Sequence, residues 1–186
     1  SNSTGPSEGA DSVGATTTID NFVSGVRGDG ATWTTQTSAA DNSWQNVIYA
    51  NGMFVAVSYT GTGNRVMTSL DGITWTSRTS PNSRNYNWLS VAYGNGIFVA
   101  VACGVTSGSV CSASSATDRI MTSSDGVTWT SRSTPGDNSQ WSSIAYGNGL
   151  FVAVAYSGTT GYLVMTSPDG INWTLRRSAA GNNWWS

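Results

Sequence analysis

An internal repeat is the feature that most constrains this chain of 186 residues. The stretch Trp88-Leu-Ser-Val-Ala-Tyr-Gly-Asn-Gly-Ile-Phe-Val-Ala-Val101 recurs with few changes from Trp44 to Val57 and from Trp141 to Val154. Its first tryptophan stands at positions 44, 88, 141 and 184, which gives periods of 44, 53 and 43 residues. A period of this length is typical of stacked repeat units, so we interpret the chain as copies of one supersecondary structure.

Each repeat predicts four short β-strands. Trp88–Tyr93 alternates large apolar residues with small or polar ones, and Ile97–Ala102 is a nearly continuous apolar run that predicts an inner strand. The intervening Gly94-Asn95-Gly96 supplies residues that tolerate a positive φ in a tight hairpin. Arg119–Ser123 and Val127–Arg132 predict a second hairpin around an Asp-Gly turn.

The aromatic residues fall in columns when the repeats are aligned. Four strands of this length cannot bury an apolar face alone, so the units must stack against one another. Eight of the nine tryptophans occupy two columns, which indicates packing between units rather than ligand stacking. The same interpretation applies to the tyrosine and phenylalanine columns, which are Tyr49, Tyr93 and Tyr146, and Phe54, Phe98 and Phe151.

A second conserved block follows each first block, as in Met121-Thr-Ser-Ser-Asp-Gly-Val-Thr-Trp129. The pattern Ser-x-Asp-Gly-x-Thr-Trp resembles the Asp-box of sialidase-type (BNR-like) β-propellers, in the shortened form common in bacterial and phage repeat proteins. The resemblance covers roughly residues 29 to 184, and it implies a turn between the third and fourth strands of a propeller blade. The residues that match are Ser69, Asp71, Trp75, Ser123, Asp125, Trp129, Ser167, Asp169 and Trp173, and a degenerate N-terminal copy keeps Asp29 and Trp33.

These patterns predict an all-β, β-propeller-like fold with about three complete four-stranded blades and terminal half-blades. We expect a Ser/Gly-rich arm or linker at 1–18, a degenerate half-repeat at 19–43, repeats at 44–87, 88–140 and 141–183, and the start of a further repeat at 184–186. Closed propellers have 4–8 blades, so we expect an incomplete propeller. Further repeats of a longer chain, or self-association with neighbouring chains, would complete it. Head-to-tail completion gives a fibre unless it closes.

Catalytic residue types are scarce in this sequence. It has no His, no Lys and one Glu, Glu8, in the N-terminal tail. The sialidase resemblance would imply an arginine triad, a Tyr nucleophile with a Glu partner, and an Asp acid/base. The recurring Arg78, Arg132 and Arg176 are spread one per repeat and cannot easily converge on one carboxylate. We therefore expect no enzymatic activity, no catalytic residues and no cofactor.

Cys103 and Cys111 lie eight residues apart in a Gly/Ser-rich insert and predict a disulfide, which indicates an oxidising compartment. A metal site would lack further Cys or His ligands.

The net charge of −2 and the 10% of charged residues argue against nucleic-acid binding. No apolar stretch approaches the ~18 residues of a membrane span, so we expect no membrane insertion. We expect an extracellular, cell-surface or virion-surface location.

The hypothesis that these observations favour is a non-enzymatic interaction or structural module of a surface fibre, phage tail appendage or adhesin. The alternatives are a fragment of a degenerate, sialidase-like glycosidase, and an assembly factor that binds one protein partner. Glycans are a possible ligand, although ordinary loop packing is the competing interpretation of each candidate residue. The candidate contacts to a ligand or partner are Tyr86, Asn87, Tyr156, Tyr162, Trp184 and Trp185, and Asn2 is a possible glycosylation site.

Overall fold

The computed structural model of the protein describes residues 33–81, 85–107, 110–112, 117–135, 139–158 and 161–179. The chain divides into two compact units, Ser1–Gln36 and Thr37–Ser186. Every helix or strand in the described ranges is a β-strand, and all of these strands belong to the second unit. The described part of the first unit, 33–36, is without regular secondary structure.

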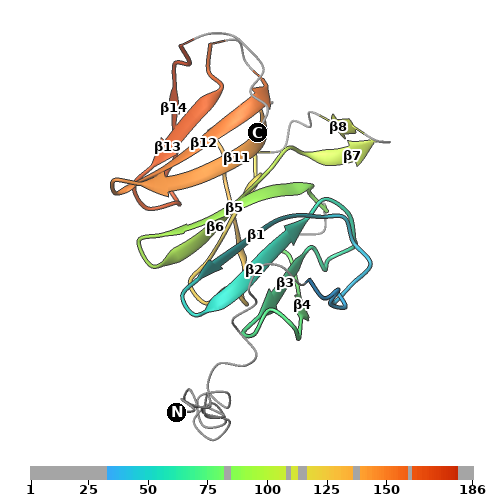
Figure 1. Cartoon of the computed structure of the whole chain (residues 1–186). Coiled ribbons are helices and arrows are strands. Elements are labelled where there is room, and N and C mark those ends of the chain that lie inside the picture. The colour runs from blue at the N-terminus through green and yellow to red at the C-terminus, as the bar shows by residue number, and fades with distance from the viewer. Residues whose placement is uncertain are drawn as a thin grey trace, which may run out of the picture. The chain divides into compact units, whose positions relative to one another are not determined.

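The strands form three four-stranded antiparallel sheets (Figure 1). Sheet 1 runs in the order β1 (Trp44–Ala50), β2 (Met53–Ser58), β3 (Val66–Ser69) and β4 (Thr76–Arg78). Sheet 2 has β5 (Trp88–Gly94), β6 (Ile97–Ala102), β9 (Ile120–Ser123) and β10 (Thr130–Arg132). Sheet 3 has β11 (Gln140–Gly147), β12 (Leu150–Ser157), β13 (Val164–Ser167) and β14 (Thr174–Arg176). The predicted all-β class is confirmed.

The first hairpin of each sheet turns on an Asn-Gly pair. Asn95 and Gly96 have φ values of 48° and 79°, and the pairs Asn51-Gly52 and Asn148-Gly149 repeat this conformation. Two successive positive φ values are the requirement of a type I′ turn, whose twist matches that of the flanking strands. The hairpin therefore closes tightly, and it places the ring centroids of Tyr93 and Phe98 4.6 Å apart.

The fourth strand is shorter than predicted. In sheet 2 the pattern predicted a strand over Val127–Arg132, whereas β10 begins at Thr130. The backbone N–H groups of Val127 and Thr128 donate to Oδ1 of Asp125 at 2.8 and 2.7 Å, so these residues belong to the turn. The sequence pattern also missed a small hairpin of β7 (Val105–Ser107) and β8 (Val110–Ser112) in the cysteine-bearing insert.

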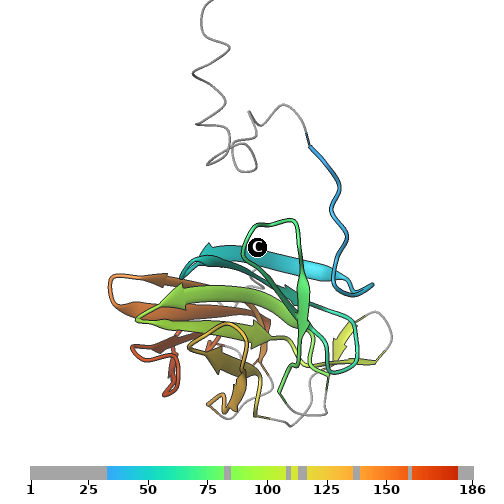
Figure 2. The same ribbon diagram turned by 90° about the horizontal axis from the view of Figure 1, so that it is seen from below.

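The three sheets stack face to face, with β5 between β1 and β11 (Figure 2). Each sheet has two chemically different sides. We call the side that carries the Trp, Tyr and Phe columns the aromatic face, and the opposite side, which carries the Val columns, the aliphatic face. Two hydrophobic cores result, one at each junction between neighbouring sheets.

Candidate functional site

Each internal junction joins the aliphatic face of one sheet to the aromatic face of the next. At the first junction the aliphatic face of sheet 1 packs on the aromatic face of sheet 2, and at the second junction sheet 2 packs on sheet 3 in the same way. The side chains that meet are fully or almost fully buried. They are Val55, Val57, Val66, Trp88, Phe98, Met121 and Trp129 at the first junction, and Val99, Val101, Ile120, Trp141, Phe151 and Met165 at the second.

Two glycine positions allow this close approach. A Cβ atom on Gly94 of sheet 2 would lie within 3.0 Å of several ring carbons of Tyr146 of sheet 3, so that ring rests directly on the glycine. A Cβ atom on Gly170, in the turn of sheet 3, would lie 2.8 Å from Ile97 and 2.7 Å from Val99 of sheet 2. At these two positions, sheets 2 and 3 therefore fit together with no room for a methyl group.

Polar contacts also cross both junctions at equivalent positions. The backbone N–H of Val91 in β5 donates to Oδ1 of Asn46 in β1 at 3.0 Å. The backbone N–H of Ile144 in β11 donates to Oγ of Ser90 in β5 at 3.2 Å. Asn46 and Ser90 occupy the same place in their repeats, so this bond sets the register between the first strand of one sheet and the first strand of the next.

A buried arginine strengthens each junction. Arg65 precedes β3, and its guanidinium donates at 2.8 Å to the backbone oxygens of Tyr59, Gly61 and Tyr86 and to Oδ1 of Asn87. Arg119 holds the same place in sheet 2 and donates to the backbone oxygen of Ser139. Sequence reasoning missed this pair of residues, although an arginine before the third strand of two repeats was a visible signal. In the third repeat the position is Leu163.

The same faces lie uncovered, among the described residues, on the outer sides of sheets 1 and 3. On the aromatic face of sheet 1, Val47 and Tyr49 are 53% and 62% exposed, whereas Val91, which matches Val47 in sheet 2, is 3% exposed. A groove of about 220 Å³ crosses this face and is lined by Trp44, Gln45, Asn46, Val47, Ala56, Met67 and Trp75.

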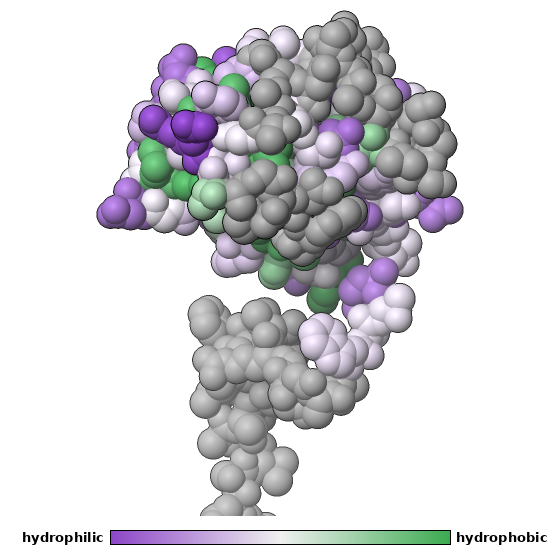
Figure 3. Space-filling model, turned by 90° about the horizontal axis from the view of Figure 1, so that it is seen from above, coloured by the Kyte–Doolittle hydropathy of each residue, from purple (hydrophilic) through white to green (hydrophobic). Residues whose placement is uncertain are grey.

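On the aliphatic face of sheet 3, Val152, Val154 and Val164 are only half-buried. The residues that match them in sheet 2 are Val99, Val101 and Ile120, all fully buried. Figure 3 shows one side of the molecule, on which hydrophobic residues reach the surface between hydrophilic ones. Apolar columns that form a core inside the stack therefore continue onto its two outer sheets.

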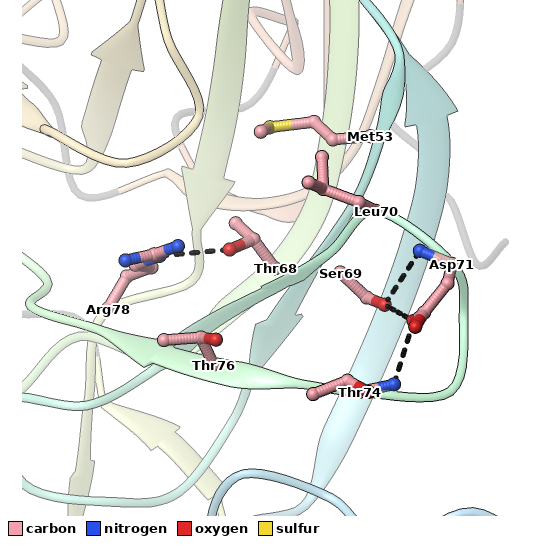
Figure 4. A pocket seen from close by; sticks show the side chains of 8 residues that line it. All are labelled: Met53, Thr68, Ser69, Leu70, Asp71, Thr74, Thr76 and Arg78. Atoms are coloured by element: carbon pink, nitrogen blue, oxygen red, sulfur yellow. Dashed lines mark hydrogen bonds between the residues drawn. The ribbon is translucent and has the colours of Figure 1, made fainter.

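A Ser-x-Asp-Gly turn joins the third and fourth strands of each sheet (Figure 4). In sheet 1, Oδ1 of Asp71 accepts the hydroxyl of Ser69 and the backbone N–H groups of Ile73 and Thr74, all at 2.7 to 2.8 Å. Ser69 Oγ in turn accepts the N–H of Gly72, and the indole N–H of Trp75 donates to the carbonyl oxygen of Gly72 at 3.2 Å. Sheets 2 and 3 repeat all of these bonds.

These hydrogen bonds stabilise the charged form of the aspartates. The N–H groups of Thr74 and Ile73 and the hydroxyl of Ser69 lower the pKa of Asp71 to about 2. The N–H groups of Thr128 and Val127 likewise lower the pKa of Asp125 to about 2, and the N–H of Asn172 lowers the pKa of Asp169. A carboxylate with so low a pKa is a poor general acid near neutral pH, so these groups act as structural acceptors.

The recurring arginines after the turns are also held within their own sheets. Nε of Arg78 donates to Oγ1 of Thr68 at 2.9 Å, and Arg132 and Arg176 make the same bond to Thr122 and Thr166. In sheet 1 this pair lines a hollow of about 430 Å³, which Met53 and Leu70 border on its apolar side (Figure 4). The structure places the three arginines in three separate sheets.

The candidate contact residues do not gather at one place. Tyr86 and Asn87 are buried, which corrects their interpretation as ligand contacts: the hydroxyl of Tyr86 donates to Asp118, and the backbone oxygen of Asn87 accepts the N–H of Cys103. Tyr156 is half-buried, and Tyr162 is 40% exposed beside β13. Trp33 is exposed and lies before the first strand, whereas Asn2, Glu8, Asp29, Trp184 and Trp185 lie outside the described residues.

The predicted disulfide is confirmed between Cys103 and Cys111, whose Cα atoms lie 5.7 Å apart. It ties the end of β6 to β8. The part of the chain that the structure describes has no cluster of three His, Cys, Asp or Glu side chains that could hold a metal ion. It also has no helix long and apolar enough to cross a membrane.

No protein-family model matches the chain, and no curated protein sequence matches it. Solved structures do match. The chain is similar to YCF48 bound to a D1 peptide (TM-score 0.53, 19% identity, 76% of this chain and 42% of that one) and to YCF48 from Cyanidioschyzon merolae (TM-score 0.51, 16% identity, 73% and 37%). It is also similar to the computationally designed Ika4 protein (TM-score 0.51, 11% identity, 81% and 83%).

The chain therefore spans less than half the length of the YCF48 structures that it matches. At these identities the similarity shows the fold alone. Together with the three stacked four-stranded sheets, it shows that the chain has a β-propeller fold whose described sheets do not close into a ring.

Proposed function

We propose that the chain is a non-enzymatic Asp-box repeat module that acts outside the cell as a structural or interaction element. It binds its partner through the aromatic face of sheet 1 and the aliphatic face of sheet 3. The observation that carries this proposal is the exposure of Val47 and Tyr49 on a face whose counterparts in sheets 2 and 3 form hydrophobic cores. Apolar surface of this kind is typical of interaction sites.

Three further observations support the proposal. The turn in each sheet has the hydrogen bonds that make Ser69, Asp71 and their equivalents a fold-stabilising motif. The depressed pKa of Asp71 and Asp125 makes these carboxylates unsuitable proton donors for glycoside hydrolysis near neutral pH. The disulfide fits an oxidising, extracellular compartment.

Two measurements test the absence of activity and the use of the open face. The oxidised chain is first incubated with fluorogenic sialosides and other glycosides, and we expect no turnover. A photo-crosslinking phenylalanine analogue then replaces Tyr49 in one variant and Ser124, in the exposed turn of sheet 2, in a control. On irradiation of the cells or particles that carry the protein, we expect a crosslinked partner from position 49 and little from position 124.

Glycosidase activity that co-purifies with the folded chain would contradict the non-enzymatic proposal. Equal crosslinking from positions 49 and 124, or none from either, would contradict the proposed use of the open face. A single unrelated protein crosslinked at position 49 would support an interaction function and favour the assembly-factor alternative over a fibre.

A further inference from the structure

We propose that the partner of the two open faces is a second copy of this chain, whose aromatic face of sheet 1 docks on the aliphatic face of sheet 3 of the first copy. This inference rests on the function proposed above and names the partner of that site. Its basis is that the chain contains two internal examples of the same junction. The two open faces are the two sides of a third junction of this kind, each without its counterpart in the described part of the chain.

The first match is between a tyrosine ring and a glycine. At the second internal junction the ring of Tyr146 rests on Gly94. Gly147 holds the place of Gly94 in sheet 3, and none of the described residues has an atom within 4 Å of the position of a Cβ on it. Tyr49 holds the place of Tyr146 in sheet 1 and is 62% exposed. Seating Tyr49 of one copy on Gly147 of the other reproduces the internal contact.

The second match involves the glycine of the turn. Gly126 of sheet 2 approaches Met53 and Val55 of sheet 1, as Gly170 of sheet 3 approaches Ile97 and Val99 of sheet 2. The equivalent Gly72 of sheet 1 approaches only Phe54 of its own sheet, among the described residues. Leu150 and Val152 on sheet 3 of the first copy are the aliphatic pair that Gly72 of the second copy would approach in the same way.

Polar groups follow the same register. Asn46 and Ser90 each accept a hydrogen bond from a backbone N–H in the first strand of the next sheet. Ser143 holds their place in sheet 3, and the N–H of Val47 is the corresponding donor in sheet 1 of a second copy. Among the charged residues, Arg176 of sheet 3 and Asp71 of sheet 1 correspond to Arg132 of sheet 2 and Asp169 of sheet 3. The exposed Arg177 of sheet 3 stands where sheet 2 has Ser133.

The proposed junction lacks one component of the internal junctions, and this absence makes association reversible. Arg65 and Arg119 each donate a hydrogen bond to the segment that precedes the first strand of the next sheet. The acceptors are the backbone oxygens of Tyr86 and Ser139. Leu163 replaces them in sheet 3, so the junction between copies lacks a guanidinium with several charge-assisted hydrogen bonds. We therefore expect association that depends on concentration rather than a permanent complex.

The contact is heterologous, since the aromatic face of one copy meets the aliphatic face of the other. Two copies that close head to tail would hold six sheets, which lies within the 4–8 blades of known propellers. Copies whose rotation does not close would add on as a filament. Both assemblies use the same junction, and it is this junction that the experiment tests.

The mass of the full, oxidised chain is measured by sedimentation velocity and light scattering over a series of concentrations. We expect the mass to rise from 19.4 kDa to twice that value or more. Gly147→Trp places a bulky ring at the seat of Tyr49. Because a Cβ at this position meets no described atom within 4 Å, we expect the variant to fold and to weaken association at least roughly tenfold. The matched control is Ser124→Trp, in the exposed turn of sheet 2.

A mixture of two variants tests the direction of the contact. Gly147→Trp retains an intact aromatic face, and Tyr49→Ala retains an intact aliphatic face. Each variant alone should stay monomeric, whereas their mixture should form a complex of one copy of each, because one productive junction remains. A symmetric contact between two aromatic faces would not be affected by Gly147→Trp at all.

A wild-type chain that stays monomeric at every concentration would overturn the inference, as would self-association that Gly147→Trp does not weaken. If the chain is monomeric but position 49 crosslinks to another protein, the inference fails while the proposed interaction function stands. If the chain's own residues 1–32 or 180–186 cover these faces, the wild type stays monomeric and crosslinks within itself, which also overturns the inference.

Discussion

Replacing Gly94 by alanine tests whether the fit between sheets 2 and 3 limits the stability of the fold. The added Cβ would lie under 3.0 Å from three ring carbons of Tyr146, a separation that side chains do not show. Ordinary carbon contacts lie at about 3.5 to 4.0 Å, so the ring must move by roughly an ångström. Overpacking of this kind costs about 1 to 3 kcal/mol.

An opposing contribution comes from the unfolded chain. Alanine has fewer backbone conformations to lose than glycine, which favours the variant by about 0.4 to 1 kcal/mol. We therefore expect Gly94→Ala to lower the free energy of unfolding by about 1 to 2 kcal/mol. The first repeat has Ala50 at the same place, facing the column of Tyr93, so the stack can adjust to a methyl group and the fold should survive.

Gly147→Ala is the matched control, because a Cβ at that position meets no atom of the described part of the chain within 4 Å. It should leave stability unchanged or raise it slightly. Both variants are unfolded in urea at a concentration that keeps the chain monomeric, with tryptophan fluorescence and circular dichroism compared as a check of two-state behaviour. Equal stability changes for the two variants would refute the reasoning, since the tight contact between sheets would then cost nothing.

Three further predictions use equivalent positions in different sheets. Val99→Ala, at a fully buried position, should lower the free energy of unfolding by about 1 to 3 kcal/mol. Val152→Ala, at a half-buried position of the same column, should lower it clearly less, and urea unfolding measures both. Arg65→Met should cost about 2 to 4 kcal/mol because buried oxygens lose their donor, whereas Leu163→Met in the same column should cost under about 1.5 kcal/mol. Asp125 has a folded pKa of about 2, below its unfolded value near ~3.9, so its contribution to stability is present above pH ~4 and is lost as the pH falls toward about 2. Asp125→Asn should therefore be less stable at neutral pH and flatten the loss of stability in that acid range, and an unchanged acid profile would contradict this assignment.

Much of the fold could be predicted because its local chemistry is repeated. The Asn-Gly pairs specify the first hairpin of each sheet, and the Ser-x-Asp-Gly pattern specifies the turn before the fourth strand. The aromatic columns indicated packing between units, and the structure places Trp88 and Trp141 in the two cores. Each of these signals concerns residues close together in sequence or a column visible on alignment.

The candidate site was harder to predict because it depends on contacts between repeats. Tyr86 and Asn87 were candidate ligand contacts with loop packing as the alternative, and both are buried beside Arg65, more than twenty residues earlier in the chain. Nothing in a single repeat shows which columns form each face. The difference between Val99 and Val152, identical in sequence context but not in burial, follows only from the order in which the sheets stack.

Sheets 1 and 3 also lack a feature that the outer repeats of a stacked array usually have. Repeat arrays generally end in capping units with a polar outer face, because exposed core columns lower solubility. Here Val47 and Tyr49 on sheet 1, and Val152 and Val154 on sheet 3, keep the apolar residue types of the internal columns. Polar residues at these four positions would have left the two internal cores intact, since none of the four belongs to either core. The apolar character of these faces is therefore not required by the three-sheet stack itself, and the contact beyond the stack that we propose would account for it.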